Sequence, residues 1–172
     1  MNVPSGVWVD EEGMIVRPPE PAFPGRSPYQ DAKIPDTLPE RLKEMLAEAR
    51  EIKTEPEKYV DALRDWVSHG KESRFVLPAE EVIRRSRPRP MQEAEAAARF
   101  ELGEHLHRKG LSADAARQWR EAHRLQPENW TYKRQAWSLV DPTQGPSEEY
   151  EGDWLSDVRK IGAENYYPPL QM

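Results

Sequence analysis

Apolar residues recur every three or four positions along much of the chain. Between residues 37 and 52 they fall at Leu38, Leu42, Met45, Leu46, Ala49 and Ile52. A second run, which ends at His69-Gly70, contains Tyr59, Val60, Leu63, Trp66 and Val67. Because this spacing puts the apolar residues on one face of a helix, we expect two amphipathic helices joined by a few residues into an antiparallel hairpin. A short third helix is predicted for 79–85, after Pro78.

The start of the chain follows a different pattern. Residues 7–10 and 14–16 are short β-prone runs, and Gly13 in the turn between them can take a positive φ, so we expect a β-hairpin. Eight of the 17 prolines lie at or before Pro39. Since proline lacks a backbone donor and fixes φ, the segment 17–34 is predicted to be an extended strap or linker. A polyproline ligand for an aromatic groove is the alternative.

The clearest pattern lies in residues 96–129, within a stretch that has no proline between Met91 and Gln126. Two helical stretches meet at residues 109–110, and Pro127 ends the second. Gly103 in the first stretch and Ala115 in the second are small, so two antiparallel helices can approach closely, with Trp119 beside them. The sequence therefore predicts a tightly packed helical pair.

This 34-residue segment resembles a tetratricopeptide repeat in its length and in the residues Leu102, Gly103, Leu106, Ala115, Trp119, Ala122 and Pro127. It departs from the family at two positions that often hold an aromatic residue, where Arg99 and Leu106 stand; Phe100 can substitute for the first. The resemblance implies a groove for a protein partner, bordered here by Arg99, Glu101, His105 and Lys109. One repeat cannot bury its own apolar face, so we expect it to dock on other structure.

Aromatic residues are dense from residue 130 onward, at Trp130, Tyr132, Trp137, Tyr150, Trp154, Tyr166 and Tyr167. A capping helix is predicted for 130–139 and a short amphipathic turn for 154–158. We expect the rest of this region to be an irregular strap anchored by its rings. The alternative is that the rings line a groove for a peptide or another domain.

Together these patterns predict a mainly α protein. Its architecture is a helical-hairpin array with one tetratricopeptide-type unit, a short N-terminal β-hairpin and a proline-rich strap. Four segments are expected: the β-hairpin and strap over 1–36, the helical hairpin with a short helix and a basic linker over 37–90, the repeat with its capping helix over 91–140, and the irregular aromatic strap over 141–172.

Composition narrows the function. The chain has 172 residues and no cysteine, which excludes disulfides, thiolate metal sites and thiol nucleophiles. A net charge of −6 argues against binding nucleic acid. The one basic run, 84–90, is interpreted as a solvated linker. The alternative is that this run binds phosphate or an acidic partner. No apolar run reaches about 18 residues and no signal peptide is evident, so we expect a cytoplasmic protein without a membrane partner.

No motif for catalysis, phosphate binding or dinucleotide binding is present. Glu104 and His107 have the spacing of a di-iron ligand pair, but no second pair exists. His123 is expected to be exposed on the second helix of the repeat. We therefore expect no catalytic residue, metal or cofactor in this chain, and we interpret it as a non-catalytic module that binds a protein segment or a neighbouring domain.

An alternative function comes from residues 2–17, which are similar to the second half of a thioredoxin-like domain. Pro4, after Val3, stands at that family's cis-proline position, which lies against the redox-active residue. The whole chain resembles the C-terminal part of bacterial redoxin-type proteins with a helical-repeat extension. This implies either a degenerate partial domain or a gene model begun at an internal methionine, with the redox-active cysteine or selenocysteine encoded upstream. The alternative is therefore a fragment of a thiol or selenol oxidoreductase whose neighbouring partner is a thioredoxin-like domain.

Overall fold

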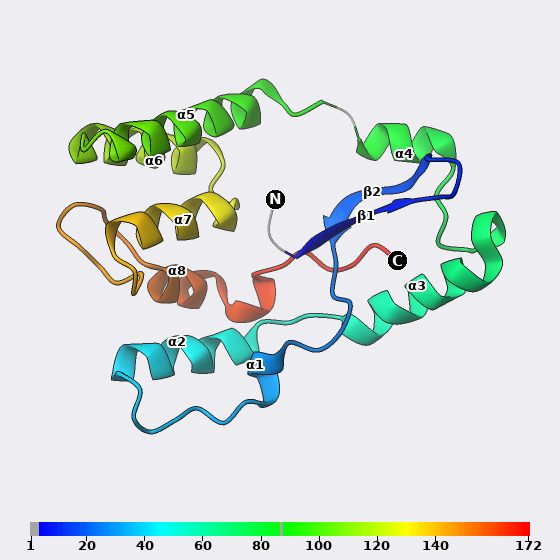
Figure 1. The fold of residues 1–172 in the computed structure, drawn as a ribbon, viewed down its shortest axis with the longest axis horizontal. Coiled ribbons are helices and arrows are strands. Elements are labelled where there is room, and N and C mark those ends of the chain that lie inside the picture. The colour runs from blue at the N-terminus through cyan, green and yellow to red at the C-terminus, as the bar shows by residue number, and fades with distance from the viewer. Residues whose placement is uncertain (1–3, 87) are drawn as a thin grey trace. The chain divides into compact units, whose positions relative to one another are not determined.

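The structure is a computed structural model that describes residues 4–86 and 88–172 (Figure 1). The chain is mainly helical with a two-stranded antiparallel β-hairpin near its start, which confirms the predicted fold class. It divides into two compact units. We call residues 88–161 the helical unit, and residues 4–86 together with 162–172 the hairpin unit. The predicted segment 141–172 is therefore split between the two units at residue 161.

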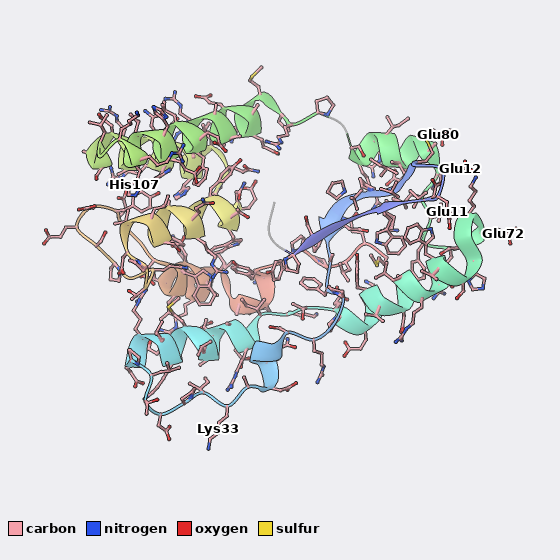
Figure 2. All side chains as sticks on the ribbon, in the orientation of Figure 1. Glu11, Glu12, Lys33, Glu72, Glu80 and His107 are labelled. Carbon is pink, nitrogen blue, oxygen red and sulfur yellow. The ribbon has the colours of Figure 1, made fainter. Side chains whose placement is uncertain are left out.

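The β-hairpin consists of β1, Ser5–Val9, and β2, Ile15–Pro21. The strands pair Ser5 with Pro21, Gly6 with Glu20, Trp8 with Arg17 and Val9 with Ile15, with irregularities on either side of Trp8. Asp10 closes the turn by accepting hydrogen bonds from the Glu12 and Met14 amides, and Gly13 has a φ of 80°. Glu11 and Glu12 lie at the hairpin tip (Figure 2). β2 is longer than predicted because a strand at the edge of a sheet tolerates proline.

The hairpin unit also contains four α-helices: α1, Pro28–Asp31; α2, Glu40–Glu51; α3, Pro56–His69; and α4, Ala79–Arg85. Two 3-10 turns, Gly70–Glu72 and Ala163–Asn165, also belong to it. The strap predicted for 17–34 is thus shorter than expected, since β2 occupies its start and α1 interrupts it. The predicted helix at 79–85 is confirmed by α4.

The antiparallel helical hairpin predicted for 37–69 is wrong. α2 contacts α1 and the turn at Ala163–Asn165, whereas α3 lies against the β-hairpin, where Trp66 stacks on Trp8 with 4.8 Å between ring centroids. Figure 1 shows α2 and α3 following one another rather than lying side by side. Ile52 after α2 is extended, and the large apolar surface of Trp8 is the partner that α3 covers.

The core of the hairpin unit gathers residues from both ends of the chain. It contains Trp8, Val16, Ala22, Phe23, Tyr59, Ala62 and Leu170. Leu170 is held by its backbone: its amide donates to Glu55 at 2.9 Å, and its carbonyl accepts from Lys58 at 2.7 Å. The Leu170 amide lowers the pKa of Glu55, because it stabilises the charged carboxylate. The C-terminal segment is therefore an integral part of this unit.

Arg17 ties three segments of the hairpin unit together and is almost fully buried. Its guanidinium pairs with Glu20 at 2.5 Å and donates to the carbonyls of Phe75 at 2.7 Å and Gln171 at 2.8 Å. It also lies 5.5 Å from the ring centroid of Trp8. A planar group with several fixed donors suits this arrangement of converging oxygen acceptors.

The helical unit contains α5, Met91–Arg108; α6, Ser112–Leu125; α7, Trp130–Val140; and α8, Trp154–Ile161. α5 and α6 form the predicted pair, joined at Gly110, which has a φ of 76°. α7 confirms the predicted capping helix and stacks on α5 through Tyr132 and Phe100, whose ring centroids are 4.4 Å apart. Asn129 caps α7 by accepting from the Tyr132 amide.

α8 corrects the prediction of an irregular strap over 141–172. Asp153 caps this helix by accepting from the amides of Leu155 and Ser156. Trp154, Leu155 and Val158 are buried, and Lys133 of α7 pairs with Asp157 at 2.9 Å. The cap and the apolar face of this segment together make it a helix rather than a turn.

Candidate functional site

The packing between α5 and α6 fixes which face of α5 is open. Gly103, Ala115, Trp119 and Ala122 are buried, with Trp119 only 1% exposed. An added Cβ on Gly103 would lie 2.5 Å from Cδ1 of Trp119, so the indole packs directly on the α5 backbone. Leu106 is half-buried, and Pro127 is exposed just beyond α6. The four buried residues, Gly103, Ala115, Trp119 and Ala122, form the internal contact of the pair.

The opposite side of α5 is uncovered, and we call it the α5 outer face. By helical spacing it carries Met91, Ala98, Leu102, His105 and Lys109, with Glu101 at its margin. Leu102 is 43% exposed and Met91 84% exposed. Leu102 therefore points away from the packing that the other repeat-signature residues make, and it stands among the three polar residues predicted to border a groove.

Arg99 does not join that face. It lies on the α6 side of α5, where it pairs with Glu95 at 3.1 Å and donates to Gln118 at 3.0 Å. The structure thus brings together Glu101, His105 and Lys109 of the four predicted groove residues and separates the fourth. The sequence could have indicated this pairing, because Glu95 and Arg99 are four residues apart and side chains at that spacing are neighbours on a helix.

The prediction that His123 is exposed is wrong. Its ring lies against Trp137 and Tyr150, and Nδ1 is 2.6 Å from the Tyr150 hydroxyl. Burial, with a smaller effect of Lys133, lowers the pKa of His123 to about 4, and burial raises the pKa of the Tyr150 phenol. The sequence signal for this burial is the spacing of His123 from Trp119. Residues four apart share a helix face, so His123 lies on the same face as the buried Trp119.

We predict that His123 makes stability depend on pH. From about pH 6.5 down to about pH 4 the unfolded imidazole binds a proton that the folded one does not, so the contribution of His123 is full above pH 6.5 and is lost as the pH falls. Urea unfolding of the native protein should therefore show about 1–2 kcal/mol more loss between about pH 7.5 and pH 5 than unfolding of His123→Gln. Equal losses in the two proteins would contradict the prediction.

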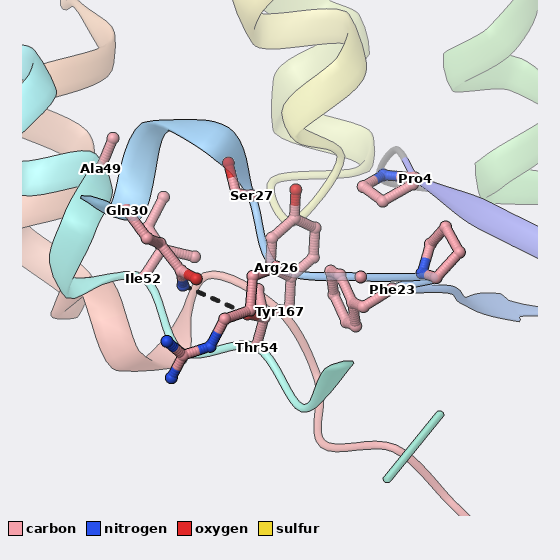
Figure 3. A pocket seen from close by; sticks show the side chains of 11 residues that line it. Pro4, Phe23, Arg26, Ser27, Gln30, Ala49, Ile52, Thr54 and Tyr167 are labelled. Atoms are coloured by element: carbon pink, nitrogen blue, oxygen red, sulfur yellow. Dashed lines mark hydrogen bonds between the residues drawn. The ribbon is translucent and has the colours of Figure 1, made fainter. Parts of the chain in front are cut away.

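A cavity of about 610 Å³ lies within the hairpin unit (Figure 3). Its walls include Pro4, Phe23, Ile52 and Tyr167, and Phe23 and Tyr167 meet edge to face with 5.1 Å between centroids. Arg26 also lines it, and its guanidinium is 3.4 Å from Glu57. The cavity is large enough for a small apolar molecule, but among the described residues its lining contains no carboxylate, imidazole or other acid–base pair. Pro4 thus lies in a cavity wall, while Val3 is outside the described residues.

The basic run predicted as a linker begins inside α4. Arg84 and Arg85 both bind Glu81, at 2.6 Å and 2.5 Å, and their hydrogen bonds lower the pKa of Glu81 to about 2. Arg87 lies outside the described residues. Two of the guanidiniums thus already have a carboxylate partner, which reduces the positive charge that this run has available to bind phosphate.

Within the part of the chain that the structure describes, no group of three or more His, Asp or Glu side chains is placed to hold a metal ion. In the same residues no helix is long and apolar enough to cross a membrane. No protein-family model, curated protein or solved structure matches this chain. The resemblances to a tetratricopeptide repeat and to a thioredoxin-like domain therefore stay predictions.

Proposed function

We propose that the helical unit is a non-catalytic docking module that binds a protein segment or a neighbouring domain through the α5 outer face. The supporting observation is the exposure of Leu102, a large apolar side chain, at the centre of this face. On a well-packed helical pair whose other side is buried, an exposed leucine with an exposed methionine on the same face offers an apolar anchor.

The surrounding charges suit a protein partner. Glu101 and Lys109 have opposite signs and flank Leu102 and His105 along the helix. Exposed rim charges of this kind contribute more to orientation and to the choice of partner than to affinity. A matching partner would place an apolar side chain on Leu102, a basic group near Glu101 and an acidic group near Lys109.

Site-directed crosslinking tests this function, since the chain has no cysteine and any introduced one is unique. Leu102→Cys, carrying a photo-crosslinker, is expected to form a discrete protein adduct in an extract of the source cells. Arg117→Cys on the exposed side of α6 is the matched control and should not form that adduct. Adding Glu101→Lys and Lys109→Glu should reduce the adduct at least about tenfold, because both rim contacts become repulsive.

Two checks accompany this prediction. Far-UV circular dichroism should show that the charge variant keeps its helical content. A purified partner identified from the adduct should bind the unlabelled native protein in solution. If the control position gives the same adduct, or if position 102 gives none, the α5 outer face is not a docking surface.

A second function is proposed from the hairpin unit: the chain is the C-terminal part of a thioredoxin-like thiol or selenol oxidoreductase, with Pro4 in the wall of its active site. What favours it is that Pro4 directly precedes β1 and lines a cavity with Phe23 and Tyr167. Translating the DNA upstream of Met1 tests it. A stop codon without redoxin-like coding sequence before it would overturn this second proposal and leave the first untouched.

A further inference from the structure

The two edges of the β-hairpin differ in how they are protected. β2 contains Pro18, Pro19 and Pro21, which have no amide hydrogen to offer, and the Val16 carbonyl already accepts from the Leu77 amide at 3.2 Å. β1 has the sequence SGVWV, with neither a proline nor a charge. Among the described residues no strand lies on the other side of β1. Of the two strands that the described residues form, β1 is therefore the one that presents neither a proline nor a charge to a further strand.

The outward face of the hairpin is also apolar. Trp8 and Val16 point into the core, whereas Val7, Val9 and Ile15 are 45–47% exposed. Natural edge strands are usually guarded by charges, prolines or a covering element, and two strands alone are marginal as a sheet. An edge without proline or charge, beside an apolar face, is an arrangement to which another β-strand can add.

We propose that β1 pairs antiparallel with β1 of a second copy, forming a four-stranded sheet across a two-fold axis. In the register centred on Val7, each Val7 faces its counterpart, Gly6 faces Trp8, and Ser5 faces Val9. No like charges oppose one another in this register, and Asp10 faces Pro4. A parallel arrangement would instead bring the two acidic turns, residues 10–12, together. The pairing is self-complementary, as a two-fold interface requires.

This interface involves the hairpin unit and not the α5 outer face, so it is independent of the proposed docking function. It would bury Val7 and extend the apolar outward face continuously over both copies. Backbone hydrogen bonds would supply affinity, and the alternation of side chains would fix the register.

Sedimentation equilibrium of the full chain from about 1 to about 200 µM is the first test, and a monomer–dimer equilibrium is expected. Val7→Lys opposes two cations at the two-fold axis and should raise the dimer dissociation constant at least about tenfold. Mixing Val7→Lys with Val7→Glu should restore the dimer. Ile15→Lys is the matched control, since Ile15 is equally exposed on the same face but lies on β2, and it should still dimerise.

A disulfide trap tests the register separately. Val7→Cys would place two thiols directly opposite each other, so mild oxidation should give a covalent dimer. Val67→Cys on α3 is the control, because Val67 is more exposed than Val7 but lies outside the interface. A native protein that stays monomeric at about 200 µM, a dimer that survives Val7→Lys, or equal oxidation of the two cysteine variants would overturn the proposal.

Discussion

Replacing Gly103 with alanine is expected to destabilise the helical unit by about 1–3 kcal/mol, although alanine is the better helix former by about 1 kcal/mol. The new Cβ would lie 2.5 Å from Cδ1 of Trp119, and the indole has little room to retreat. It is flanked by Tyr150 at 5.9 Å and by His107 at 5.6 Å between ring centroids. Overpacking therefore outweighs helix propensity. Urea unfolding followed by tryptophan fluorescence and circular dichroism measures the loss.

Two further variants isolate this contact. Ala98→Gly on the exposed side of the same helix reports the propensity difference alone, and it should be destabilising by at most about 1 kcal/mol. In a Trp119→Leu background the smaller side chain leaves space, so Gly103→Ala should become neutral or stabilising. If Gly103→Ala stabilises the native protein as a normal helix position would, the close approach of α5 and α6 is wrong.

Arg17→Ala is expected to cost about 3–5 kcal/mol of stability in the hairpin unit. The substitution leaves the Glu20 carboxylate, whose side chain is only 13% exposed, without its partner and leaves the Phe75 and Gln171 carbonyls without a donor. It also removes the cation from the face of Trp8. Unfolding in urea, followed through the fluorescence of the tryptophans, is the measurement.

Two controls separate charge from packing. Arg17→Lys keeps the charge but cannot reach all three acceptors with one ammonium group, so it should recover only part of the loss. The double variant Arg17→Met, Glu20→Met removes both charges and should be more stable than Arg17→Ala. If Arg17→Ala unfolds at the same urea concentration as the native protein, Arg17 does not hold the three segments together.

The parts of the fold that could be predicted are those that depend on local spacing. Gly103, Ala115 and Trp119 lie within one helical pair, so their sequence pattern carries the packing between α5 and α6. The hairpin turn was equally predictable from the sequence, since Asp10 and Gly13 act on their immediate neighbours. For the same reason, three of the four residues predicted at the groove lie on one side of α5. His105 and Lys109 are on the α5 outer face, and Glu101 is at the margin of that face.

What could not be predicted depends on residues far apart in the chain. The pattern of α2 and α3 shows two amphipathic helices but does not show that Trp8 is the surface that α3 covers. The two carbonyl partners of Arg17 lie 58 and 154 residues away, and no periodicity in the sequence indicates them. His123 is buried by Tyr150, which belongs to a loop with no regular pattern.

The division of the hairpin unit into two stretches of sequence bears on the order of folding during synthesis. Residues 88–161 leave the ribosome before residues 162–172, and the pair α5–α6 needs only contacts within 34 residues of sequence. Local contacts form early and chains fold as they emerge. The hairpin unit, by contrast, lacks Leu170 and the Gln171 carbonyl until the whole helical unit has been synthesised. Trp8 and Arg17 are translated before the helical unit, yet their partners Leu170 and Gln171 are translated after it. Limited proteolysis of nascent chains should therefore find α5 and α6 protected before β1 and β2.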